Sequence, residues 1–449
     1  MIPMNHKKNI MKKIILLLTV GLPVLTCAQT NQAFTLSLKQ AMELGLKNRF
    51  DRKVFQYNIP IAENDLSKSK KGWIPEVQAA GDIQYTTQIQ PTYIPKGFVG
   101  FGEPGLLTLG AKNMTVFGLS LVQPLFKPGI NTNVKIAVTN LALQKEKIRG
   151  DEMDIKNKIS LAYLDVLLKR LQFRIAENEE ARFKEYEELA AGKYRMGTLI
   201  ENDYLRAKLD YKNAKVKTAM MSQNDSLAMD YLKYQINIPE EDILTLSDSI
   251  ETIRFDSEAL QPESVFQNRT EIKQLELQRQ ENKLQLKKVR QNALPSVSFT
   301  GYYAGIYQNQ DFHYNESKWW APHSYLGLQF SIPITSNFIN KNEMTEYELR
   351  QDQLELELQQ EKSAIQFQIR KASDDLQNAK ENMQNAKENY SLSQTIYKNQ
   401  RQQFTIGVFR YSDLLETEKS LDKAEQIYIE AVYEYLIAQV AYEKATGSL

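Results

Sequence analysis

The chain has 449 residues, of which 42% are hydrophobic, so it is long enough for two or three ordinary domains with a sizeable core. Its 56 lysine and arginine residues are balanced by 55 aspartate and glutamate residues, which leaves a formal net charge of +1. Without a basic excess, the composition argues against a protein that binds nucleic acid or acidic lipid.

The N-terminus has the pattern of a secretory signal peptide. Four lysines between positions 7 and 13 precede an apolar run from Ile14 to Leu25, which is too short for a stable membrane helix. We expect cleavage after Ala28, so that residues 1–28 are removed and the remaining chain contains no cysteine. The alternative is that Cys27 becomes a lipidated N-terminal residue, although the preceding Thr26 is larger than such sites usually accept.

Matched residues indicate that the chain contains two copies of one structural unit. The pair Asn48-Arg49 recurs as Asn268-Arg269, at an offset of 220 (268 − 48). The pair Ile74-Pro75 recurs as Leu294-Pro295 at the same offset (295 − 75). Two matches of this kind at one spacing predict an internal repeat.

The offset falls to 210 further along the chain, where Gly197 matches Gly407 (407 − 197). The extra residues of the first copy are expected in a surface loop between Val77 and Pro124, because loops absorb insertions more readily than packed elements. The predicted divisions are the signal peptide (1–28), a first repeat (29–236), an inter-repeat linker (237–262) and a second repeat (263–449).

Each repeat is predicted to begin with a helix of about 30 residues that ends before a proline. A proline disfavours the helical conformation of the residue that precedes it, so the helix-to-strand junction falls there. The first of these helices spans 38–71, with Pro60 as the place for a bend, and the second spans 262–292.

Alternating apolar and polar residues after each of these helices predict four strands in two hairpins. The first hairpin covers 77–123 and the second covers 297–332. In the first strand the odd positions from Val77 to Ile89 are mostly apolar and the even positions mostly polar, so one face of the sheet is apolar.

Two long helical stretches close each repeat, with a turn at Gly197 in the first and at Gly407 in the second. From Ile365 to Tyr390 apolar residues follow in steps of four and three, the 3.5-residue average of a coiled-coil seam. The seam resumes from Leu421 to Tyr442. A continuous helix from residue 340 to the second turn would extend about 100 Å.

No pattern in the sequence indicates catalysis or a metal site. The three histidines, His6, His313 and His323, are not accompanied by cysteine or by helical HxxxH spacing. A nucleophile elbow and a phosphate-binding loop of the Walker type are also absent. We therefore expect no enzyme activity, no metal and no cofactor.

Aromatic residues gather near the predicted strands, namely Tyr302, Trp319, Trp320 and Tyr325. Membrane barrels place amphipathic rings at the boundary between lipid and water, which predicts an aromatic girdle. The alternative interpretation is that these are ordinary core aromatics.

The predicted strands are too few for a membrane barrel made by one chain. Beyond residue 28 no apolar run approaches the ~18 residues that a membrane helix needs, so a membrane-spanning part would have to be a closed barrel. A closed barrel needs at least about eight strands. The chain is therefore expected to contribute a sheet to an oligomer whose helices extend the tube into water.

These features resemble one known family, the TolC-type outer-membrane efflux proteins. The resemblance rests on the two helix-to-strand prolines at 75 and 295, the segment Gln123-Pro124-Leu125-Phe126 and the two glycine turns. It implies a mostly α, α+β fold and a homotrimer, with 3 × 4 = 12 strands in one β-barrel in the outer membrane of a Gram-negative bacterium. A long α-helical coiled-coil barrel would continue into the periplasm.

The resemblance also assigns roles at the two helical turns. Gly197, Thr198, Gly407 and Val408 would form the tip that contacts a periplasmic adaptor protein. Asp413 and Glu416 match the family's aperture carboxylates, and in the first copy only Asp203 is acidic. Three chains would then give a ring of six carboxylates, which favours cations.

Two residues depart from the family's pattern at the closed tip. The best-known members have a tyrosine three positions before the second glycine and an arginine two after it, and both bind the aspartate that matches Asp203. Here these positions hold Phe404 and Phe409, and Arg410 is one position away, about 100° around a helix. We therefore expect a tip that is held shut by other contacts.

The resulting hypothesis is a passive export duct. Substrates would be delivered by an inner-membrane transporter of the RND or ABC class through the adaptor, and the cargo, whether drugs, small molecules, ions or secreted protein, is left open. The alternative hypothesis is a soluble periplasmic coiled-coil scaffold without channel activity, which would not need four alternating strands.

Overall fold

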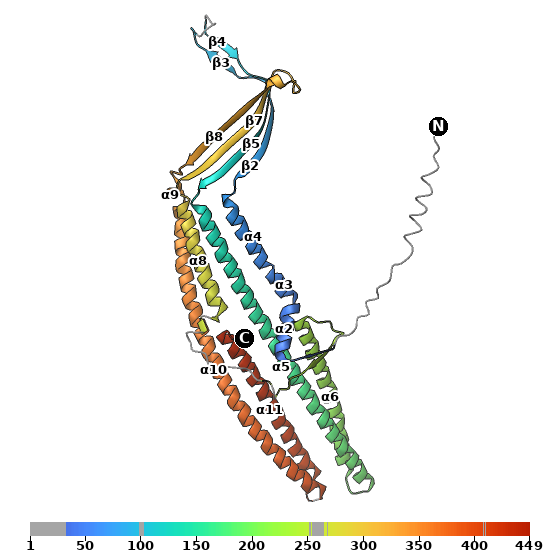
Figure 1. The fold of residues 1–449 in the computed structure, drawn as a ribbon. Coiled ribbons are helices and arrows are strands. Elements are labelled where there is room, and N and C mark those ends of the chain that lie inside the picture. The colour runs from blue at the N-terminus through green and yellow to red at the C-terminus, as the bar shows by residue number, and fades with distance from the viewer. Residues whose placement is uncertain are drawn as a thin grey trace, which may run out of the picture.

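The computed structural model describes residues 33–97, 103–250, 253, 265–266, 268–406, 408 and 410–449. The predicted signal peptide with Cys27, and the tip residues Gly407 and Phe409, lie outside the described residues. The molecule is elongated, with a sheet towards one end and long helices that run away from it (Figure 1). In the described part of the chain, no helix combines the length and the hydropathy that a membrane-spanning helix requires.

The predicted strands form one antiparallel sheet in the order β2–β5–β7–β8. The strands are β2 (Glu76–Tyr85), β5 (Asn113–Phe126), β7 (Ser296–Asn309) and β8 (Trp320–Ser331). The two predicted hairpins are thus confirmed, and they lie side by side because β5 pairs with β7. β2 and β8 are the two edges of this sheet.

Two short strand pairs were not predicted. β3 (Pro91–Ile94) and β4 (Gly105–Thr108) form a small hairpin within the long loop of the first copy, and in Figure 1 it projects beyond the main sheet. β1 (Ala33–Leu36) pairs in parallel with β6 (Ile243–Leu246) near the middle of the molecule. Four residues carry too little alternation to reveal a strand.

The register of the sheet separates an apolar face from a polar face. Leu119 lies between Ala79 and Tyr303, so odd-numbered residues of β2, β5 and β7 share one face. Large apolar side chains on this face are exposed in the single chain, among them Val77, Ile83, Phe117, Leu119, Leu326, Leu328 and Phe330. The other face carries Gln78, Ser120 and Thr300.

The first predicted helix is divided into α2 (Leu38–Asn48), α3 (Phe50–Gln56) and α4 (Asn58–Lys70). The expectation of a helix over 38–71 with a bend at Pro60 was wrong in its continuity, because the backbone leaves the helical region at Arg49 (ψ 133°). Pro60 lies in the first turn of α4, where its missing N–H removes no helical hydrogen bond. In the second copy, α8 (Thr270–Gln291) begins after Arg269.

The two matched arginines make equivalent contacts. Arg49 Nη1 donates to the carbonyl of Gln235 at 3.1 Å, and Arg269 Nη1 donates to the carbonyl of Ala445 at 2.8 Å. Those carbonyls are 210 residues apart (445 − 235) and stand near the ends of the second helices of the two hairpins. Each arginine also binds the acidic residue two positions later. In each half of the chain, this arginine–carbonyl contact joins the helix that leads to the sheet to the second helix of the long hairpin.

The long helical hairpins are α5 (Gly129–Arg195) with α6 (Glu201–Ile236), and α10 (Lys341–Thr405) with α11 (Tyr411–Thr446). A short helix, α9 (Ser336–Ile339), precedes α10. The 65 residues of α10 extend about 100 Å, as predicted. Its seam is buried at Ile365, Ala372, Ala379 and Ala386, where small side chains let the neighbouring helix approach.

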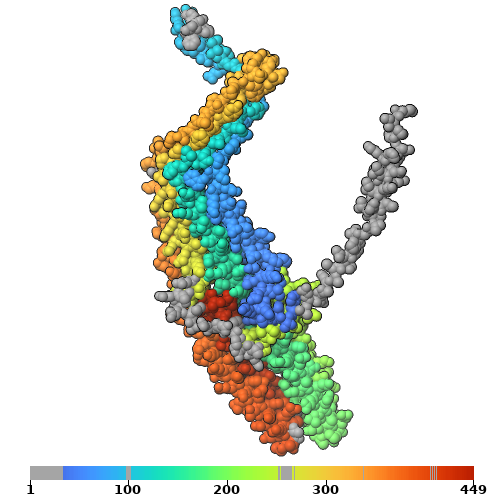
Figure 2. Space-filling view, viewed as in Figure 1, coloured from blue at the N-terminus to red at the C-terminus, as the bar shows by residue number. Residues whose placement is uncertain are grey.

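The main hydrophobic core lies where α2, α5, α6 and α11 meet beside β1 and β6. Tyr163 is fully buried there, and its hydroxyl donates to the carbonyl of Leu36 and to Asp248. Below this core the two hairpins continue to the end remote from the sheet, where Figure 2 shows the green hairpin beside the orange and red one. That end carries the candidate site.

Candidate functional site at the tips of the helical hairpins

Both hairpins turn through the same type of helix cap. Gly197 has a φ of +71°, a conformation that favours glycine, and the Thr198 N–H donates to the Lys193 carbonyl at 2.9 Å. In the second hairpin the Val408 N–H donates to the Gln403 carbonyl at 3.0 Å, which is the same bond five residues back. The predicted glycine turn at 197 is therefore confirmed, and its counterpart has the matching hydrogen bond.

A cavity of about 490 Å³ lies between the two hairpin tips. It brings together four predicted site residues that are distant in sequence, namely Thr198, Asp203, Phe404 and Arg410. Lys193 and Arg206 also line it, so three cations surround one carboxylate. Among the described residues, no ion pair joins Arg410 to Asp203, although both line this cavity.

Asp413 and Glu416 do not line this cavity. Both side chains are exposed, in the first two turns of α11, and the Ser412 hydroxyl donates to Asp413 at 3.1 Å. Their exposure on a helix end leaves both carboxylates free to face an aqueous space.

Phe404 is held by apolar and cation–π contacts rather than by a hydroxyl. Its ring lies 4.9 Å from the Lys193 ammonium and packs against a buried cluster. The cluster contains Phe183, Tyr186, Ala214, Leu414 and Leu415. Because these residues come from α5, α6 and α11, and Phe404 from α10, this cluster joins all four long helices near the tip.

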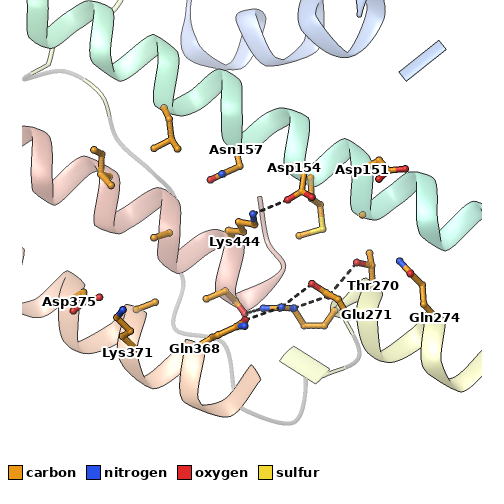
Figure 3. Close-up of a pocket in the computed structure, with 18 of the residues that line it drawn as sticks. Asp151, Asp154, Asn157, Thr270, Glu271, Gln274, Gln368, Lys371, Asp375 and Lys444 are labelled. Carbon is orange, nitrogen blue, oxygen red and sulfur yellow. Dashed lines mark hydrogen bonds and ion pairs between the residues drawn. The ribbon is translucent and has the colours of Figure 1, made fainter. Parts of the chain in front are cut away.

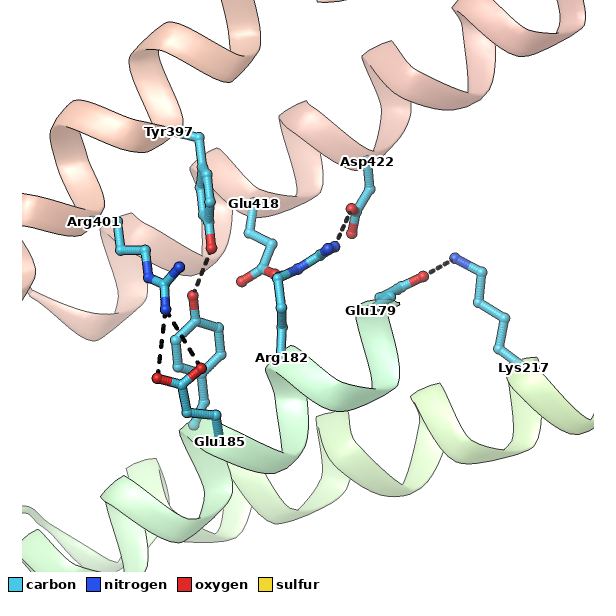
Figure 4. A network of polar contacts seen from close by, with 9 residues as sticks. Glu179, Arg182, Glu185, Lys217, Tyr397, Arg401, Glu418 and Asp422 are labelled. Carbon is cyan, nitrogen blue, oxygen red and sulfur yellow. Dashed lines mark hydrogen bonds and ion pairs between the residues drawn. The ribbon is translucent and has the colours of Figure 1, made fainter. Parts of the chain in front are cut away.

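A polar network joins the two hairpins above the cluster (Figure 4). Arg182 of α5 donates through Nε to Glu418 at 2.5 Å and through Nη2 to Asp422 at 2.8 Å, both on α11. Glu418 is 0% exposed, so this is a buried pairing. On the side of α6, Lys217 donates to Glu179 of α5.

The network holds more negative than positive charge. Arg182 and Lys217 face three carboxylates, those of Glu179, Glu418 and Asp422. Burial raises the pKa of Asp422 to about 7 and the nearby Glu179 adds to this, while Arg182 opposes it. Burial also raises the pKa of Glu418 against the opposing effect of Arg182. One proton bound by these three carboxylates balances their charge against the two cations.

Two further bridges connect α5 to α10 at the same level. The hydroxyls of Tyr186 and Tyr397 are 2.9 Å apart, and Arg401 lies 3.5 Å from Glu185. This network was not predicted, although one signal was present in the sequence. Glu418 and Asp422 occupy positions four and eight residues after the buried Leu414, on the face where apolar residues are expected.

The predicted girdle residues fall on both faces of the sheet. Tyr302 and Tyr325 are directly opposite each other on the polar face, in the middle of β7 and β8. Trp320 is opposite Tyr307 on the apolar face, and Trp319 directly precedes β8. Of these four residues, only Trp320 thus lies on the apolar face of the sheet, and Trp319 lies outside the strands.

A second cavity, of about 800 Å³, lies where α5, α8, α10 and α11 meet near the middle of the molecule (Figure 3). Lys444 pairs with Asp154 at 2.8 Å across it, and Arg269 pairs with Glu271 at 2.9 Å. Its charged lining is balanced, with four cations (Lys147, Arg269, Lys371, Lys444) and four carboxylates (Asp151, Asp154, Glu271, Asp375). No charge excess there selects a ligand.

The fold, a four-stranded sheet that continues into two long helical hairpins, is shared with solved outer-membrane channel structures. The chain is similar to the Campylobacter jejuni CmeC outer membrane channel, with a TM-score of 0.70, 16% identity, and coverage of 92% of this chain and 85% of that one. It is also similar to the open state of the Neisseria gonorrhoeae MtrE outer membrane channel, with a TM-score of 0.70, 15% identity, and coverage of 94% and 93%.

Two sequence comparisons agree with the predicted resemblance. Residues 262–448 match the outer membrane efflux protein family. The alkaline protease secretion protein AprF of Pseudomonas aeruginosa is 22% identical over 326 residues, which cover 71% of this chain and 67% of AprF. The predicted resemblance is confirmed over residues 262–448, where the chain matches the outer membrane efflux protein family. AprF, the relative found by sequence, is a secretion protein by its name.

Proposed function

We propose that three copies of this chain form one outer-membrane channel, with 12 strands in a shared β-barrel and the helices as a periplasmic tube. The observation that carries this proposal is the sheet itself. Its two edges, β2 and β8, have no partner strand among the described residues, and one face exposes many large apolar side chains. Pairing β2 of one copy with β8 of the next removes both edges and turns the apolar face towards lipid.

The helices support the same assembly. In Figure 1 the helices α3, α4 and α6 lie on the side of β2. Exposed apolar side chains follow these helices: Phe50, Val54, Tyr57 and Ile61, then Leu205, Leu209, Val216, Met220, Leu227, Tyr231 and Tyr234. On the opposite side, α10 exposes Leu349, Leu356, Phe367, Leu392 and Ile396. Stripes spaced by whole helical turns are typical of coiled-coil contacts, here between neighbouring copies.

The proposed partners follow from this placement. Gly197, Thr198 and Val408 lie at the far end of the hairpins. A periplasmic adaptor protein would contact these residues together with Gly407, and an RND or ABC transporter of the inner membrane would supply the substrate. AprF carries the name of a protease secretion protein and the family carries the name of efflux. We therefore include both secreted protein and small molecules or ions in the proposed cargo.

At rest the tip is held by the contacts between the two hairpins. Phe404 with its apolar cluster, and Arg182 with Glu418 and Asp422, take the place of the tyrosine and arginine contacts of the better-known members. Asp413 and Glu416 of three copies would line the narrowest part with six carboxylates. The girdle role is proposed for Trp319 and Trp320 alone.

Replacing Asp413 and Glu416 by alanine should enlarge single-channel currents in planar bilayers and relieve block by multivalent cations. Six carboxylates in a narrow ring hold such cations, and neutral side chains release them. The matched control replaces Glu430 and Glu434, an exposed pair on the same helix but away from the tip, and should leave the block unchanged. Currents and block equal to those of the wild type in the tip variant would refute the assignment to the aperture.

The soluble scaffold hypothesis makes a different prediction for the whole protein. A channel should fractionate with the outer membrane and migrate as a heat-modifiable trimer. The exposed apolar face of the sheet favours the channel, because a scaffold in water has no use for it.

A further inference from the structure

Three aromatic rings form a cluster on the polar face of the sheet. Tyr302 and Tyr325 are stacked with centroids 5.5 Å apart, and the His323 ring lies 5.9 Å from each of them. Tyr302 also lies beside Gly118 of β5, where an added Cβ would be 2.8 Å from the Ala304 Cβ and 3.0 Å from the Tyr302 hydroxyl. The cluster therefore extends over three neighbouring strands.

The ring faces are accessible. Tyr325 is 53% exposed, His323 is exposed and Tyr302 is half-buried. Tyr303, the next residue along β7, points to the opposite, apolar face and is 63% exposed. If the sheet is part of the proposed barrel, Tyr303 faces lipid and the cluster faces the lumen.

The charge of the sheet points to the kind of ligand. The four strands contain no lysine and no arginine, and their two carboxylates, Glu76 and Asp82, lie on the same face as the cluster. Electron-rich tyrosine faces attract cations, and quaternary ammonium groups in particular bind to such aromatic groups. No positive side chain of the strands competes for these faces.

We infer that Tyr302, His323 and Tyr325 form a lumenal site for organic cations, one in each copy, on the exit path. The position of this site in a lumen rests on the proposed function. It adds to that function a contact for cationic cargo with aromatic or quaternary ammonium groups, well away from the tip carboxylates. Tyr302 and Tyr325 then have a role other than the girdle that the sequence predicted.

The test measures block of single-channel current by tetrabutylammonium, added on the barrel side of the bilayer. Replacing Tyr302 and Tyr325 together by leucine should raise the half-blocking concentration about fivefold or more, because two exposed ring contacts are lost. Replacing both by phenylalanine keeps the ring faces and should leave the block within about twofold of the wild type. Tyr303→Leu is the matched control on the other face and should not change the block.

Equal block in the wild type and the double leucine variant would overturn the site, and so would equal losses in the Tyr303→Leu control. If the double variant fails to form a heat-modifiable trimer, Tyr325→Leu alone replaces it, because this ring is the more exposed one. If the wild type forms no channels, the proposed function fails instead. Saturation-transfer NMR of tetrabutylammonium with the detergent-purified protein then decides the site, and signals equal to those of the leucine variant overturn it.

Discussion

Replacing Arg182 by methionine is expected to separate the two hairpins at the tip and to enlarge the resting current of the channel. The change leaves Glu418 and Asp422 together without their cation, and Glu418 is completely buried. Breaking a buried ion pair costs about 3–5 kcal/mol, and we expect the lower end because the Arg182 side chain is 24% exposed. Single-channel recordings should show larger and more frequent openings at neutral pH.

Two further variants separate this effect from a general loss of stability. Arg290→Met breaks an exposed ion pair with Glu348 on the upper helices, which is worth less than about 1 kcal/mol, and should leave the resting current unchanged. Adding Glu418→Leu and Asp422→Leu to Arg182→Met removes the unpaired carboxylates and should restore closure in part. A resting current in Arg182→Met equal to that of Arg290→Met would contradict the role of this network in closing the tip.

The closed tip is expected to loosen as the pH rises from about 4 to about 7. The folded protein holds the pKa of Asp422 at about 7, above its ordinary value of 3.8, so the folded state binds the proton more tightly than an opened contact does. The stabilising effect is therefore complete below about pH 4, is lost as the pH rises to about 7, and changes little beyond that. The full effect is on the order of 2–4 kcal/mol.

Asp422→Asn should reduce this pH dependence, and Glu418, whose pKa is also raised by burial, accounts for the part that remains. The groups that face Asp422 are Glu179 and Arg182 of α5, Lys217 of α6 and Glu418 of its own helix, and all of them remain in this variant. Open probability between pH 4 and pH 8 is the quantity to compare, with Glu430→Gln as an exposed control on the same helix. If the wild type and Asp422→Asn respond equally to pH, the titrating group lies elsewhere.

Periodic features of the chain could be predicted from the sequence. The alternation after Pro75 and Pro295 gave the four strands, because a half-buried strand repeats every two residues. The steps of four and three from Ile365 gave the seam of α10, which is buried where predicted. These signals depend on neighbouring residues only, so one chain is enough to detect them.

The girdle shows how a local signal can be misread. Tyr302 has the same parity as Ser298 and Thr300, so the alternation itself already placed it on the polar face. Grouping the aromatic residues by their nearness in sequence ignored that parity. The register of the sheet places Tyr302 and Tyr325 on the polar face and Trp320 on the apolar face.

The contacts between the two hairpins could not be predicted in the same way. Arg182 and Glu418 are 236 residues apart, and their pairing depends on which face of α5 meets which face of α11. A single sequence does not show which helix faces meet. The arginines at 49 and 269, in contrast, are matched in the sequence itself and indicate a repeat. Their equivalent bonds to Gln235 and Ala445 give that match a physical cause.

Disulfide cross-linking between β2 and β8 tests the shared barrel most directly. Cys27 is the single cysteine of the chain, so other thiols must be introduced. One variant residue is Gln78→Cys on β2. The second cysteine replaces each polar-face residue of β8 in turn, such as Tyr325, Gly327 and Gln329. Within one chain these edges are separated by two strands, about 14 Å, which no disulfide spans. We predict linked dimers and trimers at one register in outer membranes. Only monomers at every register would contradict the shared barrel.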